Sequence, residues 1–385
     1  MSATAMRAAR KERLPAIAVG GGLAGAAFAL ELARNGHSVV VLERARGPHH
    51  TFCGEFISEE TQALLRSFGV DVHSLGASRV ARFRIVKGEQ QATTPLPFAA
   101  AGLSRFRLDA ALLAAAERAG AEVIRGAAVN SVESGEGAVV VRTEQHVWRS
   151  AHVAIATGKQ PLRRFVRPPS PMVGFKLHLE SPSAVRELAG TVQLVFFRGG
   201  NIGACLVDKN ILCLAWVMRD DLVRTIGSDW PAQCAHLARQ SSLMGDLLAG
   251  SQSLFAKPVA IASIPYGFMR SEEIAPGIYP VGDQLAVVPS YTGGGMAIAL
   301  YSGLAAAKAV LAGEPAAVYQ RDVLARLRPQ FRLAGGIGRL LHTPATCGAL
   351  ITAARIMPGV AARLAAATRL KGFSDIASSL EPYRG

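Results

Sequence analysis

Cysteine is scarce in this chain of 385 residues, and the few cysteines are spread along the sequence. Their number, five, is odd, and no two of them have the C-x-x-C spacing; they stand at positions 53, 205, 213, 234 and 347. Neither a disulfide framework nor a zinc site is indicated, and we expect no metal. This usage fits a protein of the reducing cytoplasm.

Aromatic and acidic residues are also few. Aromatics make up 6%, and no basic run is interleaved with them, so we expect no nucleic-acid binding. Asp and Glu number 28 against 42 Lys and Arg, which gives a formal net charge of +14. Such a surface attracts an acidic carrier protein or an anionic membrane. A genome that encodes Arg in place of Lys would produce the same balance.

The sequence lacks a convincing export signal and an unbroken membrane span. Basic residues precede the first apolar stretch, but that stretch contains Glu31 and Arg34 and has no small-residue cleavage site. The uncharged run 284–307 is long enough for a bilayer, yet Pro289 and Gly293–Gly295 break its first half. We expect a cytoplasmic protein, and a peripheral location at the inner membrane is the alternative.

A strand–helix–strand unit opens the chain. Ala16–Val19 and Ser38–Leu42 read as short buried strands on either side of an Ala- and Leu-rich helix, Leu23–Asn35. This order implies a parallel pair with a right-handed crossover. Half of the residues are hydrophobic, so a large core is available, and the length favours two domains.

The turn between the first strand and this helix reads Gly20-Gly21-Gly22-Leu23-Ala24-Gly25, a G-x-G-x-x-G pattern. Gly20 permits the tight turn, Gly22 lets the backbone approach a pyrophosphate, and Gly25 allows close packing of helix on strand. The positive end of the helix dipole then faces the phosphates. Glu43 ends the second strand and is expected to accept hydrogen bonds from the adenosine ribose. The unit predicts a dinucleotide site.

A second glycine cluster lies far along the chain. Tyr279–Asp283 reads as a strand that ends in an acid, and Pro289–Met296 as a loop that starts a helix. This stretch resembles the second FAD motif of the p-hydroxybenzoate-hydroxylase-like flavoproteins. The resemblance implies that Asp283 binds the ribityl hydroxyls and that the helix N-terminus stabilises negative charge on reduced flavin.

Other landmarks follow the same family in order and spacing. Ser104–Asp109 resembles the start of a helix that supplies an arginine to FAD, and Ala154–Gly158 a strand end near the pyrophosphate. The resemblance covers roughly residues 15–315. The FAD-binding residues that it and the glycine motifs imply are Gly20, Gly22, Leu23, Ala24, Gly25, Glu43, Arg44, Arg105, Val129, Thr157, Gly158, Gly282, Asp283, Pro289, Gly293, Gly294, Gly295 and Met296.

Within this superfamily the chain is most similar to the geranylgeranyl-reductase branch, through Cys53-Gly54-Glu55 and Thr292–Met296. Aromatic hydroxylases usually carry His after the aspartate and Asn after the second glycines, where this chain has Gln284-Leu285-Ala286 and Met296. The W-x-W-x-I-P signature of flavin halogenases is missing around Trp216, so halogenation is not expected.

The resemblance implies an FAD-dependent oxidoreductase that transfers hydride to a C=C bond of a hydrophobic or acyl-carrier-bound substrate. Two alternatives stay open. One is a monooxygenase that hydroxylates an aromatic or enolic substrate with NAD(P)H and O2, and the other is a non-catalytic electron-transfer flavoprotein. A second G-x-G-x-x-G for NAD(P)H is missing, as is normal in the superfamily, so its absence does not exclude NAD(P)H, which is the expected reductant. Ferredoxin or another flavoprotein could serve instead.

Five residues are candidates for catalysis. Cys53 and Glu55 follow the second strand on a loop that approaches the flavin in the family, where the thiol either protonates substrate or packs. Lys176 and His178 alternate along one face of the strand Phe175–Glu180, which either points into the substrate cavity or forms the solvated face of an edge strand. Tyr291 either orients substrate or covers the flavin.

The expected fold is α/β, with a Rossmann-like FAD domain of three layers from residues 1–80, 100–165 and 270–315. Residues 81–99 and 166–269 would form an inserted substrate domain with an antiparallel sheet, including a helix near Pro231–Leu248. Residues 316–385 would form a C-terminal helical segment. Its part 321–371 is basic and apolar, so it either lies on a membrane, covers a substrate tunnel, or packs as ordinary helices on the FAD domain.

Overall fold

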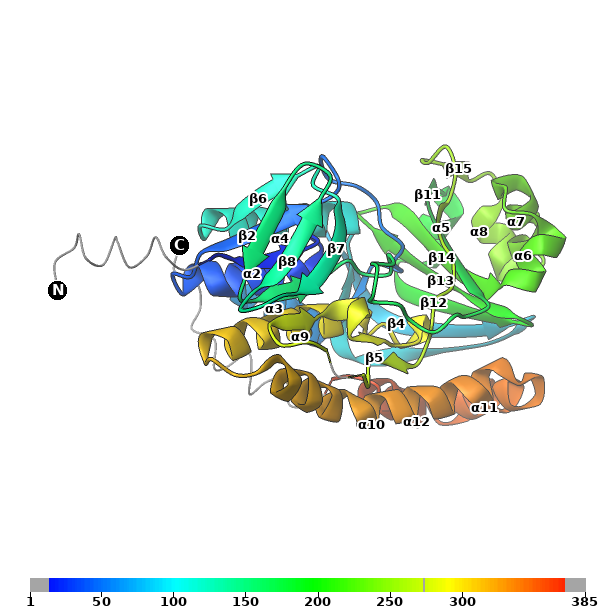
Figure 1. The fold of residues 1–385 in the computed structure, drawn as a ribbon. Coiled ribbons are helices and arrows are strands. Elements are labelled where there is room, and N and C mark those ends of the chain that lie inside the picture. Colours follow the sequence, from blue (N-terminus) through cyan, green and yellow to red (C-terminus); the bar gives the residue numbers. More distant parts are fainter. Residues whose placement is uncertain (1–13, 273, 371–385) are drawn as a thin grey trace.

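The computed structural model describes residues 14–272 and 274–370, and Figure 1 shows two parts side by side with a layer of C-terminal helices beneath both. The basic N-terminal stretch and the last residues of the C-terminal segment, 1–13 and 371–385, lie outside the described residues.

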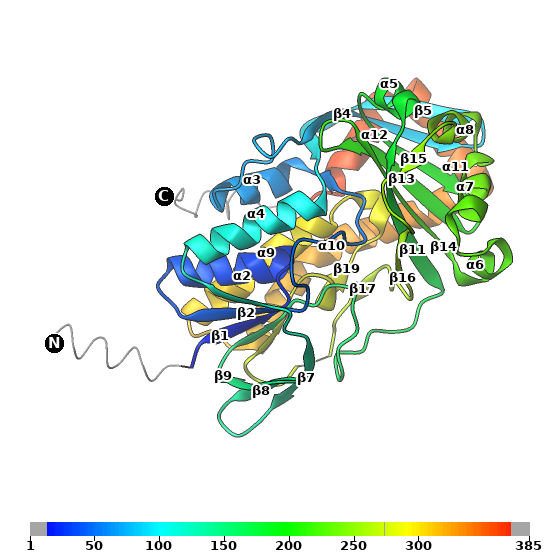
Figure 2. The ribbon, with the colours of Figure 1, turned by 90° about the horizontal axis from the view of Figure 1, so that it is seen from above.

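A five-stranded parallel sheet forms the centre of the first part, in the order β18-β10-β1-β2-β6. Its strands are β1 (Ala16–Val19), β2 (Val39–Glu43), β6 (Glu122–Arg125), β10 (Val153–Ile155) and β18 (Ile278–Pro280). Three helices cover one face, namely α2 (Leu23–Arg34), α4 (Arg105–Arg118) and α9 (Gly295–Leu311). A three-stranded antiparallel sheet covers the other, made of β7 (Val129–Ser134), β8 (Val139–Thr143) and β9 (Val147–Ser150). These three layers, which Figure 2 shows from above, confirm the predicted fold class.

The alternation of side chains along β1 explains the two packed faces. Ala16 and Ala18 face the helices, while Ile17 and Val19 face the small antiparallel sheet. Small side chains on the helix side let α2 lie close to the sheet. The glycines complete this contact, because a Cβ on Gly25 would lie 1.9 Å from the carbonyl oxygen of Gly20, which itself has a φ of +108°.

The second part contains a nine-stranded sheet in the order β15-β11-β14-β13-β12-β4-β5-β3, with β16 also paired to β11. Its strands are β3 (Phe56–Ile57), β4 (Ser78–Lys87), β5 (Gln90–Gly102), β11 (Met172–Glu180), β12 (Gly190–Phe197), β13 (Gly200–Val207), β14 (Ile211–Arg219), β15 (Gln252–Ser253) and β16 (Val259–Ile261). The pairs are antiparallel except β4 with β12, which run parallel because they come from two separate insertions. The expected antiparallel sheet thus has one parallel seam.

Four short helices cover the outer face of this sheet: α5 (Pro182–Glu187), α6 (Asp220–Ile226), α7 (Trp230–Ala238) and α8 (Ser242–Leu248). The single helix expected near Pro231–Leu248 was wrong. The chain breaks there because Ser241 adopts an extended conformation and its hydroxyl accepts from the N–H of Met244, which starts a new helix.

The remaining short elements connect these layers. They are α3 (Glu59–Ser67), β17 (Phe268–Met269), η1 (Gly282–Gln284), β19 (Ala286–Val287) and η2 (Ser290–Thr292). The turns η1 and η2 lead from the aspartate of the second glycine motif to the N-terminus of α9. This path places both glycine motifs at the carboxyl edge of the parallel sheet.

The C-terminal layer consists of α10 (Ala316–His342), α11 (Pro344–Ile356) and α12 (Pro358–Ala367). The first half of α10 packs on the FAD-domain helices through Tyr319, Leu327 and Phe331. Its end and α11 pack instead on β4, β5 and β12, through side chains that include Leu341 and Ile351. The expected packing on the FAD domain is therefore only part of the arrangement, because the helical layer contacts both parts of the molecule (Figure 1).

Among the described residues, no helix is by itself both long and apolar enough to cross a bilayer. The helices Ala345–Ile356 and Pro358–Ala367 have sufficient length and apolar character only together, and they are bent by 111° relative to each other.

Candidate functional site: an FAD cavity with an apolar extension

A cavity of about 1130 Å³ lies between the two parts and is lined by residues of both. Of the FAD-binding residues expected from sequence, all line it except Gly25 and Gly294, which lie behind the wall. Cys53, Glu55 and Tyr291 line it as well. The structure therefore brings together side chains from the first strand pair, the middle of the chain and the second glycine motif.

Two helix N-termini open onto one end of this cavity. The helices α2 and α9 begin after Gly22 and Gly294, and neither cap residue supplies a side-chain hydrogen bond to the free N–H groups. A Cβ on Gly22 would meet only the guanidinium of Arg105, at 3.6 Å. Free N–H groups, an open backbone and an arginine are what a pyrophosphate requires.

Arg105 is held in place by its neighbours. Its Nε lies 2.6 Å from a carboxylate oxygen of Asp109, one turn further along α4. Burial lowers the pKa of the guanidinium, but Asp109 and the Cys53 thiol raise that pKa more, so the net shift is upward. The side chain is a fixed cation on the cavity wall.

Besides its expected contact with the adenosine ribose, Glu43 binds the backbone of its own domain. One carboxylate oxygen accepts the N–H of Gly21 at 2.7 Å, and the other accepts the N–H of Ala45, also at 2.7 Å. The carboxylate thus fixes the glycine turn. Each oxygen keeps a further lone pair for a ribose hydroxyl on the cavity side.

Asp283 lies at the other glycine motif and is paired with a cation that the sequence reading did not single out. The ammonium of Lys159 lies 2.8 Å from its carboxylate, and Arg167 donates to its backbone carbonyl at 3.2 Å. Next to it, the side-chain amide of Gln284 donates to the carbonyl of Gly158 at 2.9 Å, which ties the two loops together. The residues present fit an FAD molecule laid from Glu43 to the N-terminus of α9.

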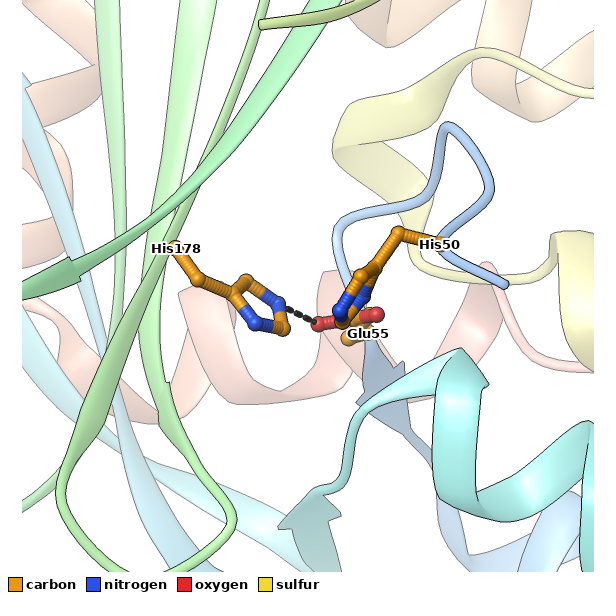
Figure 3. Close-up of side chains that lie close together, drawn as sticks. All are labelled: His50, Glu55 and His178. Atoms are coloured by element: carbon orange, nitrogen blue, oxygen red, sulfur yellow. Dashed lines mark hydrogen bonds and ion pairs between the residues drawn. The ribbon is translucent and has the colours of Figure 1, made fainter. Parts of the chain in front are cut away.

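The Glu55 carboxylate is fully buried and has donors around it. The ammonium of Lys176 forms a buried ion pair with Oε1. Nε2 of His178 lies 2.6 Å from Oε2 (Figure 3). The backbone N–H of Arg105 donates to Oε1 at 2.7 Å. Glu55 has a φ of +58°, which is uncommon for a residue with a side chain. The polar contacts hold a bend that the backbone alone disfavours.

Lys176 and His178 do share one face of β11, but neither expected position for them is correct. The strand is not an edge, because β14 pairs on one side and β15 and β16 on the other. The two side chains are buried, with exposures of 0% and 3%, and lie behind Glu55 rather than on the cavity wall. The residues that alternate with them, Phe175, Leu177 and Leu179, pack against the helices α5–α8, so the polar face turns toward the FAD domain.

The electrostatics of this group, which we call the Glu55 cluster (His50, Glu55, Lys176 and His178), keep its carboxylate charged. Burial raises the pKa of Glu55, but the hydrogen bond from His178 and the charge of Lys176 together lower it well below its usual range. The ring of His50 meets that of His178 edge-on, and burial with the nearby positive charges lowers the pKa of His50 to about 4. Glu55 is thus an anchored anion, and His50 is neutral at neutral pH.

The same cluster has the donor atoms of a metal site, since His50, Glu55 and His178 offer ligand atoms within 4.8 Å of one another (Figure 3). Two imidazoles and a carboxylate suit several divalent metals. However, the ammonium of Lys176 already neutralises this carboxylate. A divalent cation next to a buried ammonium would be repelled strongly, so the geometry favours a charge-paired cluster over a metal centre.

Cys53 lies on the cavity wall in the loop that Glu55 anchors. Two buried thiols on paired strands hold this loop from behind, because Cys205 donates to the carbonyl of Gly54 at 3.4 Å and Cys213 to that of Cys53 at 3.8 Å. Burial raises the pKa of both supporting thiols, which keeps them protonated and able to donate. Cys53 is the half-buried member of the three.

Beyond this loop the cavity extends between the nine-stranded sheet and the C-terminal helices. We call this part the apolar extension; its lining includes Phe83, Ile85, Leu96, Phe98, Val192, Leu194, Ile337, Leu341, Leu350, Ala354 and Leu364. Tyr291 stands where it begins. The hydroxyl of Tyr291 donates to the carbonyl of Ala334 at 2.9 Å, and burial raises its pKa to about 12, so it serves as a wall.

Sequence reasoning missed several of these contributors. His50, Lys159 and Arg167 take part in the site, yet none belongs to a recognisable motif, whereas the C-terminal helices line the apolar extension, as one of their three expected placements had it. Lys159 had the clearest signal, because it directly follows the expected Thr157-Gly158 pair. The others reach the site only through the packing of the two parts.

Comparisons with known proteins agree with this geometry. A family model described as an FAD binding domain matches residues 13–149. The protein FixC of Escherichia coli (strain K12) is 28% identical over 355 residues, which cover 81% of this chain and 80% of FixC.

Two solved structures show the same fold. The flavin-dependent brominase Bmp2 superposes with a TM-score of 0.76 at 16% identity, over 95% of this chain and 98% of Bmp2. A variant of the halogenase PltM in complex with FAD superposes with a TM-score of 0.69 at 15% identity, over 84% of this chain and 75% of PltM.

The fold, the cavity and the family model together define an FAD-binding flavoprotein. Residues 13–149 are similar to an FAD binding domain, and the whole chain has the fold that the flavin-dependent brominase and the FAD-bound halogenase share.

Proposed function

We propose that the protein reduces a C=C bond in an apolar, chain-like substrate bound in the apolar extension. The observation that carries this proposal is the continuity of the cavity, in which the end suited to FAD joins a wall of aliphatic and aromatic side chains. The polar groups of a dinucleotide do not require such an apolar wall. Burial of an aliphatic chain there would contribute about 0.8 kcal/mol per methylene.

FAD would be held by the N-termini of α2 and α9, Arg105, Glu43 and Asp283, and in its reduced form it supplies two electrons and one hydrogen to the substrate. The second hydrogen must arrive as a proton. We assign this proton to Cys53, because its thiol group belongs to a half-buried residue of the cavity wall. Water entering the cavity would then return a proton to the sulfur. Glu55, which stays ionised, positions the loop instead of donating.

The reductant is proposed to be NAD(P)H in transient contact. An acidic acyl carrier protein is a second means of presenting the substrate, in keeping with the net charge of +14. Oxygenation of the substrate is the competing reaction.

The proposal is tested by reducing the enzyme in the absence of oxygen and then adding an unsaturated long-chain substrate. The flavin spectrum should return to the oxidised form, and mass spectrometry should show a product heavier by two hydrogens. In deuterated water one of these should be deuterium. If these substrates do not reoxidise the flavin, and the enzyme hydroxylates them once oxygen is added, the protein is a monooxygenase instead.

The thiol is tested by Cys53→Ala. We expect turnover to fall by about a hundredfold or more, as for loss of a general acid, with FAD content unchanged. Cys234→Ala is the matched control, since Cys234 is also half-buried but lies on α7, away from the cavity. Equal turnover of both variants would remove Cys53 from the mechanism.

A further inference from the structure

The surface of the C-terminal helices has a composition that differs from the rest of the chain. Residues 323–370 contain no Asp or Glu, although Arg occurs throughout. The exposed members are Arg326, Arg328, Arg332, Arg339, Arg355 and Arg363. The acid-free stretch therefore forms a positively charged face.

Large apolar side chains are exposed on the same helices. Around the bend between α11 and α12, Ile356 is 73% exposed, Met357 53% and Val360 42%. The bend is sharp, because the two helix axes meet at 111°, and it presents these side chains at a corner. Figure 1 shows the three helices together along one side of the molecule.

This surface is continuous with the apolar extension. Leu340 on α10 and Leu364 on α12 are 43% and 39% exposed, and both also line the cavity. Arg332 lines the cavity and is exposed as well. The extension thus reaches the outside beside these residues of α10 and α12, where two leucines and an arginine form its mouth.

We propose that the α10–α12 surface docks on an anionic lipid bilayer and that the mouth at Leu340 and Leu364 admits the apolar substrate directly from it. The arginines pair with lipid phosphates and anionic headgroups, while Ile356, Met357 and Val360 enter the acyl boundary. A chain-like substrate then passes from hydrocarbon to the apolar extension without crossing water. The entry route rests on the proposed apolar substrate, whereas the docking does not.

Flotation with vesicles tests the docking without any turnover. The full chain should float with vesicles of phosphatidylcholine and phosphatidylglycerol, and only weakly with phosphatidylcholine alone. High salt should release it, because exposed charges are screened. Failure to float with the anionic vesicles would overturn the docking, and so would binding of an acidic carrier protein that occupies the same arginines in place of lipid.

Two pairs of variants separate charge from insertion. Arg355→Gln with Arg363→Gln should weaken vesicle binding about thirtyfold, whereas Arg142→Gln with Arg149→Gln on the small antiparallel sheet should not. Ile356→Asp should weaken it by about tenfold or more. Val166→Asp, at an equally exposed position of 73%, should have no effect. Equal losses in test and control variants would assign the binding to net charge alone.

The entry route has its own readout. Ile356→Asp should lower turnover of a substrate embedded in vesicles but leave turnover in detergent unchanged. Loss of both would overturn the entry route. Docking without any reduction of apolar C=C substrates would instead contradict the proposed function and leave the docking in place.

Discussion

Removal of the Lys176 ammonium should strongly destabilise the protein. Lys176 and Glu55 have side-chain exposures of 0%, so Lys176→Met leaves a buried carboxylate without its charge partner. Breaking such a pair costs about 3–5 kcal/mol. Because His178 and the N–H of Arg105 still donate to Glu55, we expect about 3 kcal/mol. Urea unfolding of the apoprotein measures this as a midpoint lowered by roughly 1 M, for a slope of about 3 kcal/mol/M.

The matched control is Lys159→Met. Lys159 also pairs with a carboxylate, that of Asp283, but the two side chains are 22% and 26% exposed, so water screens the pair. We expect a loss of at most about 1 kcal/mol. The double variant Glu55→Gln with Lys176→Met should regain most of the stability, since it removes both charges together.

The reasoning fails if Lys176→Met costs no more than Lys159→Met, or if the double variant is as unstable as the single one. Acid titration gives an independent reading. Because the folded pKa of Glu55 is lowered from 4.5, its contribution is present above that value and is lost as the pH falls through the folded pKa. The wild type should show this loss, and the double variant should not.

Two further predictions concern the cofactor and the response to acid. Glu43→Ala should weaken FAD binding by about ten- to hundredfold with an unchanged flavin spectrum, whereas Asp283→Ala should also shift the reduction potential; unaltered affinity and potential in the second variant would contradict the placement of the flavin. His50 has a folded pKa lowered from 6.5 to about 4, so acidification through this window should destabilise the wild type. In His50→Gln that loss should be smaller, as thermal unfolding at pH 7 and pH 5 would show.

The sequence by itself determined the dinucleotide half of the protein. The turn at Gly20–Gly25, the acid Glu43 and the second motif at Asp283 each act through the few residues next to them, so their geometry follows from local backbone rules. The same holds for the alternation along β11, which placed Lys176 and His178 on one face correctly.

Only the tertiary structure decided what that face meets. Glu55 is separated from Lys176 by 121 positions in the chain, and their pairing depends on how the second sheet packs against the loop after β2. Periodicity states which residues share a face, but it carries no information on what covers the face. For this reason a polar alternation on a buried, internal strand resembled a solvated edge in the sequence.

The C-terminal segment shows the same division. Its scarcity of acidic residues and its apolar character could be seen in the sequence, but they were compatible with three placements. The choice came from long-range packing, in which α10 crosses from the FAD domain to the second sheet and leaves a mouth at Leu340 and Leu364. Composition sets which surfaces a helix can cover, and the fold decides which of them it does cover, because burial depends on partners distant in the chain.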